Sequence, residues 1–516
     1  MNVTSNWLFN LADAGNVPAV DGLVRVDGFD SKGRTPEEVL AIEKARMYGA
    51  TAVFFEAGQN GSSSTAQAFV FVSDGPANDP NFAHTHQRLW SWGGVPLVYR
   101  ATPGLVQLFR CAHKADFEFK GGIAFKPSKT LKVASQIAAD PWWDAERLRN
   151  GTLWDDPKVC KALLSGEQAS QKALITEFKS LNDELNEQGV LPACLRRKLL
   201  ILSLLIAYLE KREVFEPGYF GGFLEGAERF FQVLADGSAL VTLLEHLEVR
   251  FNGNVFVLSD TDKQRLKSSN QLTRFARFVE GRRDKSGQLT LWQKYSFADL
   301  PVELISHIYQ LFVEDSASSV YIPPFLVRLM LSEILSWERL DRLIANEEVI
   351  LDPACGSGVF LVEAYKRLVV HWRSRNDWKR PGKSVLQKLV KRVHGIDRDE
   401  GAVELAAFSL CLGLCDSLEP AEIRSSIRKR PGNPFVPTAF RFTDPLRGGH
   451  RRRRFWRGVF GDRRVCGWQP GVPLRFDAPA PVSDEPQPSG PAASRSRPHL
   501  AVDWPVTFQV HETRSR

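Results

Sequence analysis

The chain has 516 residues, a formal net charge of +7 and a sequence pI of about 9.0. Its length leaves room for roughly two to four domains, and so modest a positive charge permits nucleic acid as a partner without requiring it. Seven cysteines without a Cys-x-x-Cys pair argue against a disulfide framework and a structural zinc site, and suit a reducing cytoplasm. The N-terminus lacks a signal pattern, and the most apolar run, residues 199–209, is too short to span a bilayer. We expect a soluble cytoplasmic protein with no membrane partner.

Residues 1–148 alternate between helix-like and strand-like segments, which is typical of a mixed α/β domain. A helix is predicted over residues 36–48, and strands over residues 52–55, 68–72, 96–100 and 106–111. Asp116, Glu118 and Lys120 have the local form of a metal-dependent nuclease site, in which acids hold magnesium and a lysine lies near the phosphate. Because such short matches are common and no upstream metal-binding acid stands out, we favour a non-catalytic domain over a nuclease.

Residues 149–299 are predicted to be mostly helical. Apolar residues recur at helical spacing over residues 172–185 and 191–212, between charged faces. Arginines gather over residues 274–283, where they could contact phosphates, but a solvated helix face is the favoured explanation. We interpret this region as a helical connector.

A glycine-rich turn follows a short apolar strand near residue 350. Residues 349–351 are apolar and predict the end of a buried strand, and Asp352 and Pro353 end it. Small residues fill positions 354–358, and a helix is predicted to begin at Val359. A strand, a glycine turn and a helix N-terminus together form a nucleotide cradle, because backbone N–H groups point outward and no Cβ blocks the ligand.

A second strand is predicted over residues 393–397, about 40 residues after the glycine turn. The excess over the usual spacing of about 20 is a basic insert at residues 373–391, and a helix over 402–414 follows the strand. In a doubly wound sheet, an acid at the tip of the second strand accepts from the hydroxyls of a ribose. Asp397 is therefore the ribose-binding candidate, whereas Asp399 is expected to favour the helix N-terminus through the helix dipole.

The string Asp-Pro-Ala-Cys-Gly-Ser-Gly at residues 352–358 resembles the S-adenosyl-L-methionine loop of adenine-N6 DNA methyltransferases from restriction-modification systems. Upstream, Tyr321, Ile322 and Pro323 resemble a Tyr-Thr-Pro segment that closes over the methionine end of the cofactor, with Ile322 in place of Thr. The resemblance extends over roughly residues 300–444 and implies double-stranded DNA as the partner. The cofactor-binding residues that it implies are Tyr321, Pro323, Asp352, Ala354, Cys355, Gly356, Gly358 and Asp397.

The family's catalytic Asn-Pro-Pro-aromatic motif is missing from the sequence. In the family this motif holds the exocyclic amine of a base that has left the stack. The near match at residues 432–435, Gly-Asn-Pro-Phe, lacks the second proline and is interpreted as a loop. We therefore assign no catalytic residue and expect little or no methyl transfer from this chain.

The composition changes after Leu446. Residues 447–464 are rich in Arg and Gly, and residues 470–498 in Pro, Ser and Ala, compositions that cannot bury enough apolar surface to fold. A disordered tail is predicted. We favour a shift of reading frame near Gly448, with an incomplete methyltransferase before it, over a genuine basic tail that contacts DNA phosphates.

Together these patterns predict an α/β protein that resembles a fused restriction-methyltransferase. It would have a nuclease-like or accessory domain at 1–148, a helical connector at 149–299, the first part of a Rossmann-like methyltransferase sheet at 300–446 and a tail at 447–516. One alternative is a non-catalytic protein that binds the cofactor or DNA. Another is an enzyme that methylates protein glutamine or RNA, which the large N-terminal region disfavours. The target DNA sequence and the oligomeric state stay open.

Overall fold

In the computed structural model the described residues are 20–57, 64–103, 105–111, 123–132, 141–164, 170–251, 256–280, 295–302, 304, 324–397 and 400–428. The chain divides into two compact units, residues 1–444 and 445–516, and the second lies wholly outside the described residues. The predicted tail therefore stays a prediction. The pattern of Asp116, Glu118 and Lys120 also falls outside the described residues.

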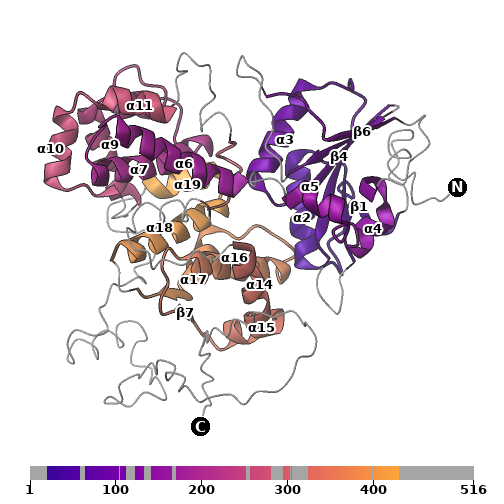
Figure 1. Cartoon of the computed structure of the whole chain (residues 1–516). Helices are drawn as coiled ribbons and strands as arrows, with labels where there is room; N and C mark the ends of the chain where they lie inside the picture. The colour runs from indigo at the N-terminus through magenta and orange to yellow at the C-terminus, as the bar shows by residue number, and fades with distance from the viewer. Residues whose placement is uncertain are drawn as a thin grey trace, which may run out of the picture. The chain divides into compact units, whose positions relative to one another are not determined.

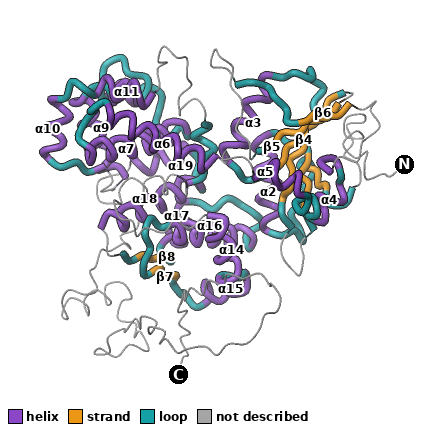
Figure 2. Tube along the Cα trace, in the orientation of Figure 1, coloured by secondary structure: helices purple, strands orange, loops and turns teal. Residues whose placement is uncertain are grey.

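Six strands form one mixed sheet in the N-terminal region (Figure 2). They are β1 (Leu23–Arg25), β2 (Ala52–Phe55), β3 (Ala66–Val72), β4 (Leu97–Thr102), β5 (Leu105–Arg110) and β6 (Lys129–Lys132). Their order follows the chain, and all neighbours are antiparallel except β3 and β4, which are parallel. Helix α3 (Pro80–Trp92) provides the crossover that a parallel pair requires. The predicted strands are confirmed, with ends that differ by at most two residues.

Both faces of this sheet are covered. Successive side chains of a strand point to opposite sides, so neighbouring residues pack in different layers. Phe55 and Phe69 pack on one face with helix α2 (Pro36–Tyr48) and α3. Phe54 packs on the other face with Trp142. The mixed α/β architecture predicted for this region is therefore confirmed as a sheet between two apolar layers.

The residues at the two ends of α2 set its length. The Thr35 side chain accepts from the Glu38 N–H, and the Glu38 carboxylate accepts from the Thr35 N–H, which is a capping box. Pro36 occupies the first turn, and Gly49 ends the helix in the left-handed conformation with φ of 77°. The helix predicted over residues 36–48 is confirmed with the same ends.

Helices fill the next region of the chain (Figure 1). They are α4 (Ala145–Asn150), α5 (Pro157–Leu164), α6 (Ser170–Glu187), α7 (Ala193–Lys211), α8 (Phe230–Leu234), α9 (Gly237–Phe251), α10 (Asp260–Ser268) and α11 (Leu272–Glu280). The apolar run at residues 199–209 is the buried centre of α7. Among the helices of the described ranges, none combines the length and apolar character needed to cross a membrane. The two helices predicted here are confirmed as α6 and α7.

The segment that contains the glycine turn alternates helices with two short strands. Its elements are α14 (Pro324–Ile334), α15 (Trp337–Ala345), β7 (Ile350–Asp352), α16 (Val359–Ser374), α17 (Lys383–Val390), β8 (Val393–Gly395), α18 (Glu400–Asp416) and α19 (Pro420–Arg428). Strands β7 and β8 are parallel, with Ile350 opposite Val393 and Asp352 opposite Gly395. The predicted strand, turn and helix are confirmed, and the basic insert contains the end of α16 and all of α17.

A buried arginine fixes the loop that leads into α3. The Arg100 side chain is fully buried, and its guanidinium donates to the Pro76 carbonyl at 2.9 Å and to Gln107 Oε1 at 2.9 Å. It also pairs with Asp79, the N-cap of α3, at 3.3 Å. Because a buried cation without its partners is costly, this network restricts the loop to one arrangement.

We predict that Arg100→Met destabilises the N-terminal sheet by about 3–5 kcal/mol, because it leaves the buried Gln107 side chain without its donor and the Asp79 carboxylate without its cation. The measurement is urea unfolding of the full chain. The free energy of the transition in which the N-terminal sheet unfolds is compared between the variant and the wild type. Arg147→Met is the control, since Arg147 pairs with Asp156 at the surface and such pairs contribute about 0–1 kcal/mol. Equal costs for the two variants would contradict the prediction.

Candidate functional site

The turn between β7 and α16 requires glycine at two positions. Gly356 has φ of 49° and Gly358, the N-cap of α16, has φ of 83°, both in the left-handed region. A Cβ on Gly358 would also lie 2.8 Å from Ala406 Cα, which is closer than such atoms approach. The backbone of the turn therefore depends on residues without side chains, as the sequence predicted.

Backbone hydrogen bonds attach this turn to the end of β8. The Cys355 N–H donates to the Ile396 carbonyl at 2.9 Å, and the Ile396 N–H donates to the Asp352 carbonyl at 2.9 Å. Within the turn, the Gly358 N–H donates to the Cys355 carbonyl at 2.8 Å. The two strand ends and the glycine turn consequently form one small rigid unit.

Two carboxylates lie at this unit, one from each strand. Asp352 Oδ1 accepts from the Ala354 N–H at 3.1 Å, and Asp397 Oδ2 accepts from the Gly356 N–H at 2.9 Å. Burial and the neighbouring charge of Asp397 raise the pKa of Asp352, against the opposing effect of the Ala354 hydrogen bond. Negative charge gathered here favours a ligand that brings hydroxyl donors or a positive charge.

The cysteine of the turn is part of the core. The Cys355 side chain is buried, and burial, with the charges of Asp352 and Asp397, raises the pKa of its thiol. A thiol in that state is a poor nucleophile, so the side chain contributes packing. Any contact of Cys355 with a ligand would therefore come from its backbone.

The structure brings together six of the eight predicted cofactor-binding residues: Asp352, Ala354, Cys355, Gly356, Gly358 and Asp397. Tyr321 and Pro323 lie outside the described residues, as do Asp399 and the near match at residues 432–435. Within the described ranges, no group of three or more His, Cys, Asp or Glu side chains could hold a metal ion.

Sequence reasoning missed two residues beside the site. Ala406 of α18 lies against Gly358, a contact between helices for which the local sequence carries no signal. His394 of β8 has a buried Nδ1 without a hydrogen-bond partner in the described part of the chain, and burial lowers the pKa of the ring. Alternation along the strand places His394 on the opposite face from Val393 and Gly395, a signal that could have drawn attention to it.

Residues 334–426 match the family model for the DNA-methyltransferase domain of MmeI. The matched segment contains the glycine turn, Asp397 and α16 to α18. Over these residues the match confirms the predicted resemblance to a DNA methyltransferase. The comparison with curated proteins finds no match.

Three solved structures are similar to parts of the chain. The type IIL restriction-modification enzyme MmeI in complex with DNA is 17% identical, with a TM-score of 0.32 over 56% of this chain and 41% of that one. The DrdV–DNA complex is 12% identical, with a TM-score of 0.29 over 74% of this chain and 37% of that one. The type IIG restriction endonuclease BpuSI is 17% identical, with a TM-score of 0.25 over 72% and 37%. The chain thus spans about two fifths of the length of these proteins.

The raised pKa of Asp352 predicts how Asp352→Asn changes stability with pH. A folded-state pKa above the unfolded value means that ionised Asp352 costs stability, and the cost disappears as the pH falls below the unfolded value. Asn keeps an oxygen for the Ala354 N–H and carries no charge. The variant should therefore be more stable than the wild type at pH 7, with an advantage that shrinks towards pH 4.

Thermal unfolding of the full chain at pH 4 and pH 7 measures this difference. Asp377→Asn is the control, because the Asp377 side chain is 89% exposed in the turn after α16. An advantage that does not change with pH, or a loss of stability at pH 7, would count against the account of Asp352.

Proposed function

We propose that the described segment from α14 to α19 is the cofactor-binding part of a DNA methyltransferase that uses S-adenosyl-L-methionine and acts on the N6 amine of adenine. One observation carries the proposal: the hydrogen bond from the Gly356 N–H to the Asp397 carboxylate, at 2.9 Å. It joins a glycine turn and a strand-end acid that are 41 residues apart, the two groups that nucleotide-like cofactors require.

The chemistry of these groups fits S-adenosyl-L-methionine. Gly356 brings no side chain to the turn beside Asp397, and the Asp397 carboxylate can accept from a ribose diol. Asp352, whose charge is costly in the free protein, would gain from a cationic ligand such as the methionine ammonium. When bound, the cofactor supplies an electrophilic methyl group on its sulfonium, and these residues hold and orient it.

The choice of DNA adenine rests on the resemblance of residues 334–426 and on the string at residues 352–358. Attack by an exocyclic amine requires the base to leave the stack and to meet hydrogen-bond acceptors beside the methyl group. Because the sequence contains no Asn-Pro-Pro motif, we assign those acceptors to no residue and expect little or no transfer by this chain. Double-stranded DNA and a cytoplasmic location complete the proposal.

The missing motif favours a second candidate, a protein that binds S-adenosyl-L-methionine or DNA without catalysis. The two candidates share the cofactor site. Transfer of a labelled methyl group to unmethylated DNA tests the second candidate: robust turnover would refute it, together with our expectation of an incomplete site. Cofactor binding without turnover supports the second candidate.

Substitutions of Asp397 test the cofactor site. Asp397→Asn keeps an acceptor for the Gly356 N–H and loses the charge, whereas Asp397→Ala loses both. A hydrogen bond to a charged group contributes about 1.5–3 kcal/mol, so Asp397→Ala should weaken binding of S-adenosyl-L-methionine by about 10–100-fold and Asp397→Asn by less.

Isothermal titration of the full chain with S-adenosyl-L-methionine measures these affinities, with Asp377→Asn as the control for loss of an exposed carboxylate. If the wild-type chain does not bind the cofactor, the proposed function is refuted. Equal affinity for wild type and Asp397→Ala removes Asp397 from the site.

A further inference from the structure

Helix α18 lies between the glycine turn and the helical region that precedes the family-matched segment. Its side chains are apolar around most of its circumference, with buried residues at 402, 403, 405, 406 and 409–415. A helix with this pattern is enclosed by other elements instead of presenting one face to solvent. Its two buried sides therefore have separate partners.

One side of α18 touches the glycine turn. Ala406 is fully buried, and a Cβ added to Gly358 would lie 2.8 Å from Ala406 Cα and 2.9 Å from Ala406 Cβ. Seven residues further along, the same interface is looser: a Cβ added to Gly413 would lie 3.6 Å from Val362 and 3.7 Å from Tyr365, which is ordinary contact. The close approach is thus confined to the turn.

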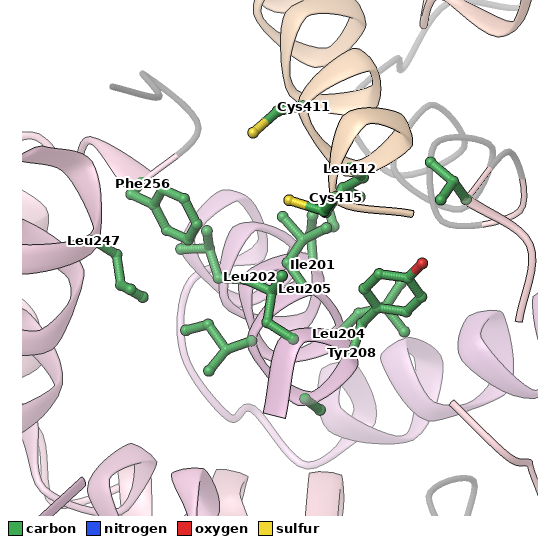
Figure 3. Close-up of a cluster of buried hydrophobic side chains, with 14 of the residues drawn as sticks. Ile201, Leu202, Leu204, Leu205, Tyr208, Leu247, Phe256, Cys411, Leu412 and Cys415 are labelled. Carbon is green, nitrogen blue, oxygen red and sulfur yellow. The ribbon is translucent and has the colours of Figure 1, made fainter. Parts of the chain in front are cut away.

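The other side of α18 packs against α7 (Figure 3). In Figure 3, Leu412 and Cys415 of α18 lie beside Ile201 and Leu205 of α7, and Cys411, Leu202 and Tyr208 belong to the same buried cluster. All of these side chains are at least 97% buried. Because buried apolar surfaces resist separation, the position of α18 follows that of α7.

Polar contacts join the C-terminal end of α7 to α18 and α19. Arg212, the C-cap of α7, donates from Nη1 to Asp416 Oδ1 at the last residue of α18. Arg424 of α19 donates to the Glu213 carbonyl at 2.7 Å. These contacts restrict sliding of α18 along α7, which apolar packing alone resists less.

We propose that α18 transmits the position of α7 to the glycine turn, with Ala406 as a positioning residue for cofactor binding. The inference takes its ligand from the proposed function. It adds helix α7, which lies outside the family-matched residues 334–426, to the scaffold of the site. Any side chain larger than alanine at position 406 would push Gly358, and with it the amides of the turn, out of place.

Three single substitutions on α18 test the role of Ala406. Ala406→Val should weaken binding of S-adenosyl-L-methionine by about tenfold or more, because the branched side chain overpacks the contact with Gly358. Ala406→Gly should lower the melting temperature, as glycine does inside helices, while keeping near wild-type affinity. Gly413→Ala, the matched control, adds a methyl group to the same interface where there is room.

Amide hydrogen exchange without ligand reports directly on the amides of the turn. We expect Ala406→Val to speed exchange at Cys355, Gly356 and Gly358, while Gly413→Ala leaves it unchanged. This readout also separates the two proposals. A wild type that binds no cofactor removes the proposed function, whereas unchanged exchange in Ala406→Val removes the role of Ala406.

Swapping the charges of Arg212 and Asp416 tests the link to α7. Arg212→Asp and Asp416→Arg should each speed amide hydrogen exchange in the turn, because each breaks the contact between the ends of α7 and α18. The double variant restores an opposite pair and should return exchange towards the wild-type rate. Unchanged rates in the single variants, or a double variant as fast as the singles, would overturn transmission from α7.

Discussion

The hydrogen bond between the Gly356 N–H and the Asp397 carboxylate joins the ends of β7 and β8, and the rest of the site depends on it. For the amide to point at the carboxylate, the turn must adopt left-handed backbone at Gly356 and Gly358, which residues with a Cβ disfavour. The same glycine at 358 lets α18 approach the start of α16. One backbone constraint thus brings together the turn, the acid and the supporting helix.

The site is organised at some cost to stability. Asp352 and Asp397 place two carboxylates near each other, and burial raises the pKa of Asp352 further. Such unfavourable charge is often tolerated at binding sites, because a ligand of opposite charge relieves it. Buried apolar side chains on both sides of α18 offset part of this cost.

Local features of the fold were predictable from sequence, and contacts between distant segments were not. Helix α2 carries its own start and stop signals, Thr35 with Glu38 and then Gly49, so both ends followed from the sequence. The glycine turn was predictable because its backbone restricts residue type, and Asp397 because it is an acid at the end of a predicted strand. The contact of Ala406 with Gly358, and the packing of α18 on α7, depend on how helices meet, and alanine or leucine in a helix gives no indication of its partner.

In the proposed function, the glycine turn and Asp397 hold S-adenosyl-L-methionine. The most direct test is ultraviolet cross-linking of methyl-labelled S-adenosyl-L-methionine to the full chain, followed by mapping of the labelled peptides. We expect label in peptides that contain residues 352–358 or Asp397, and loss of that label with excess unlabelled cofactor. Label that is absent, or confined to peptides elsewhere in the chain, would contradict it.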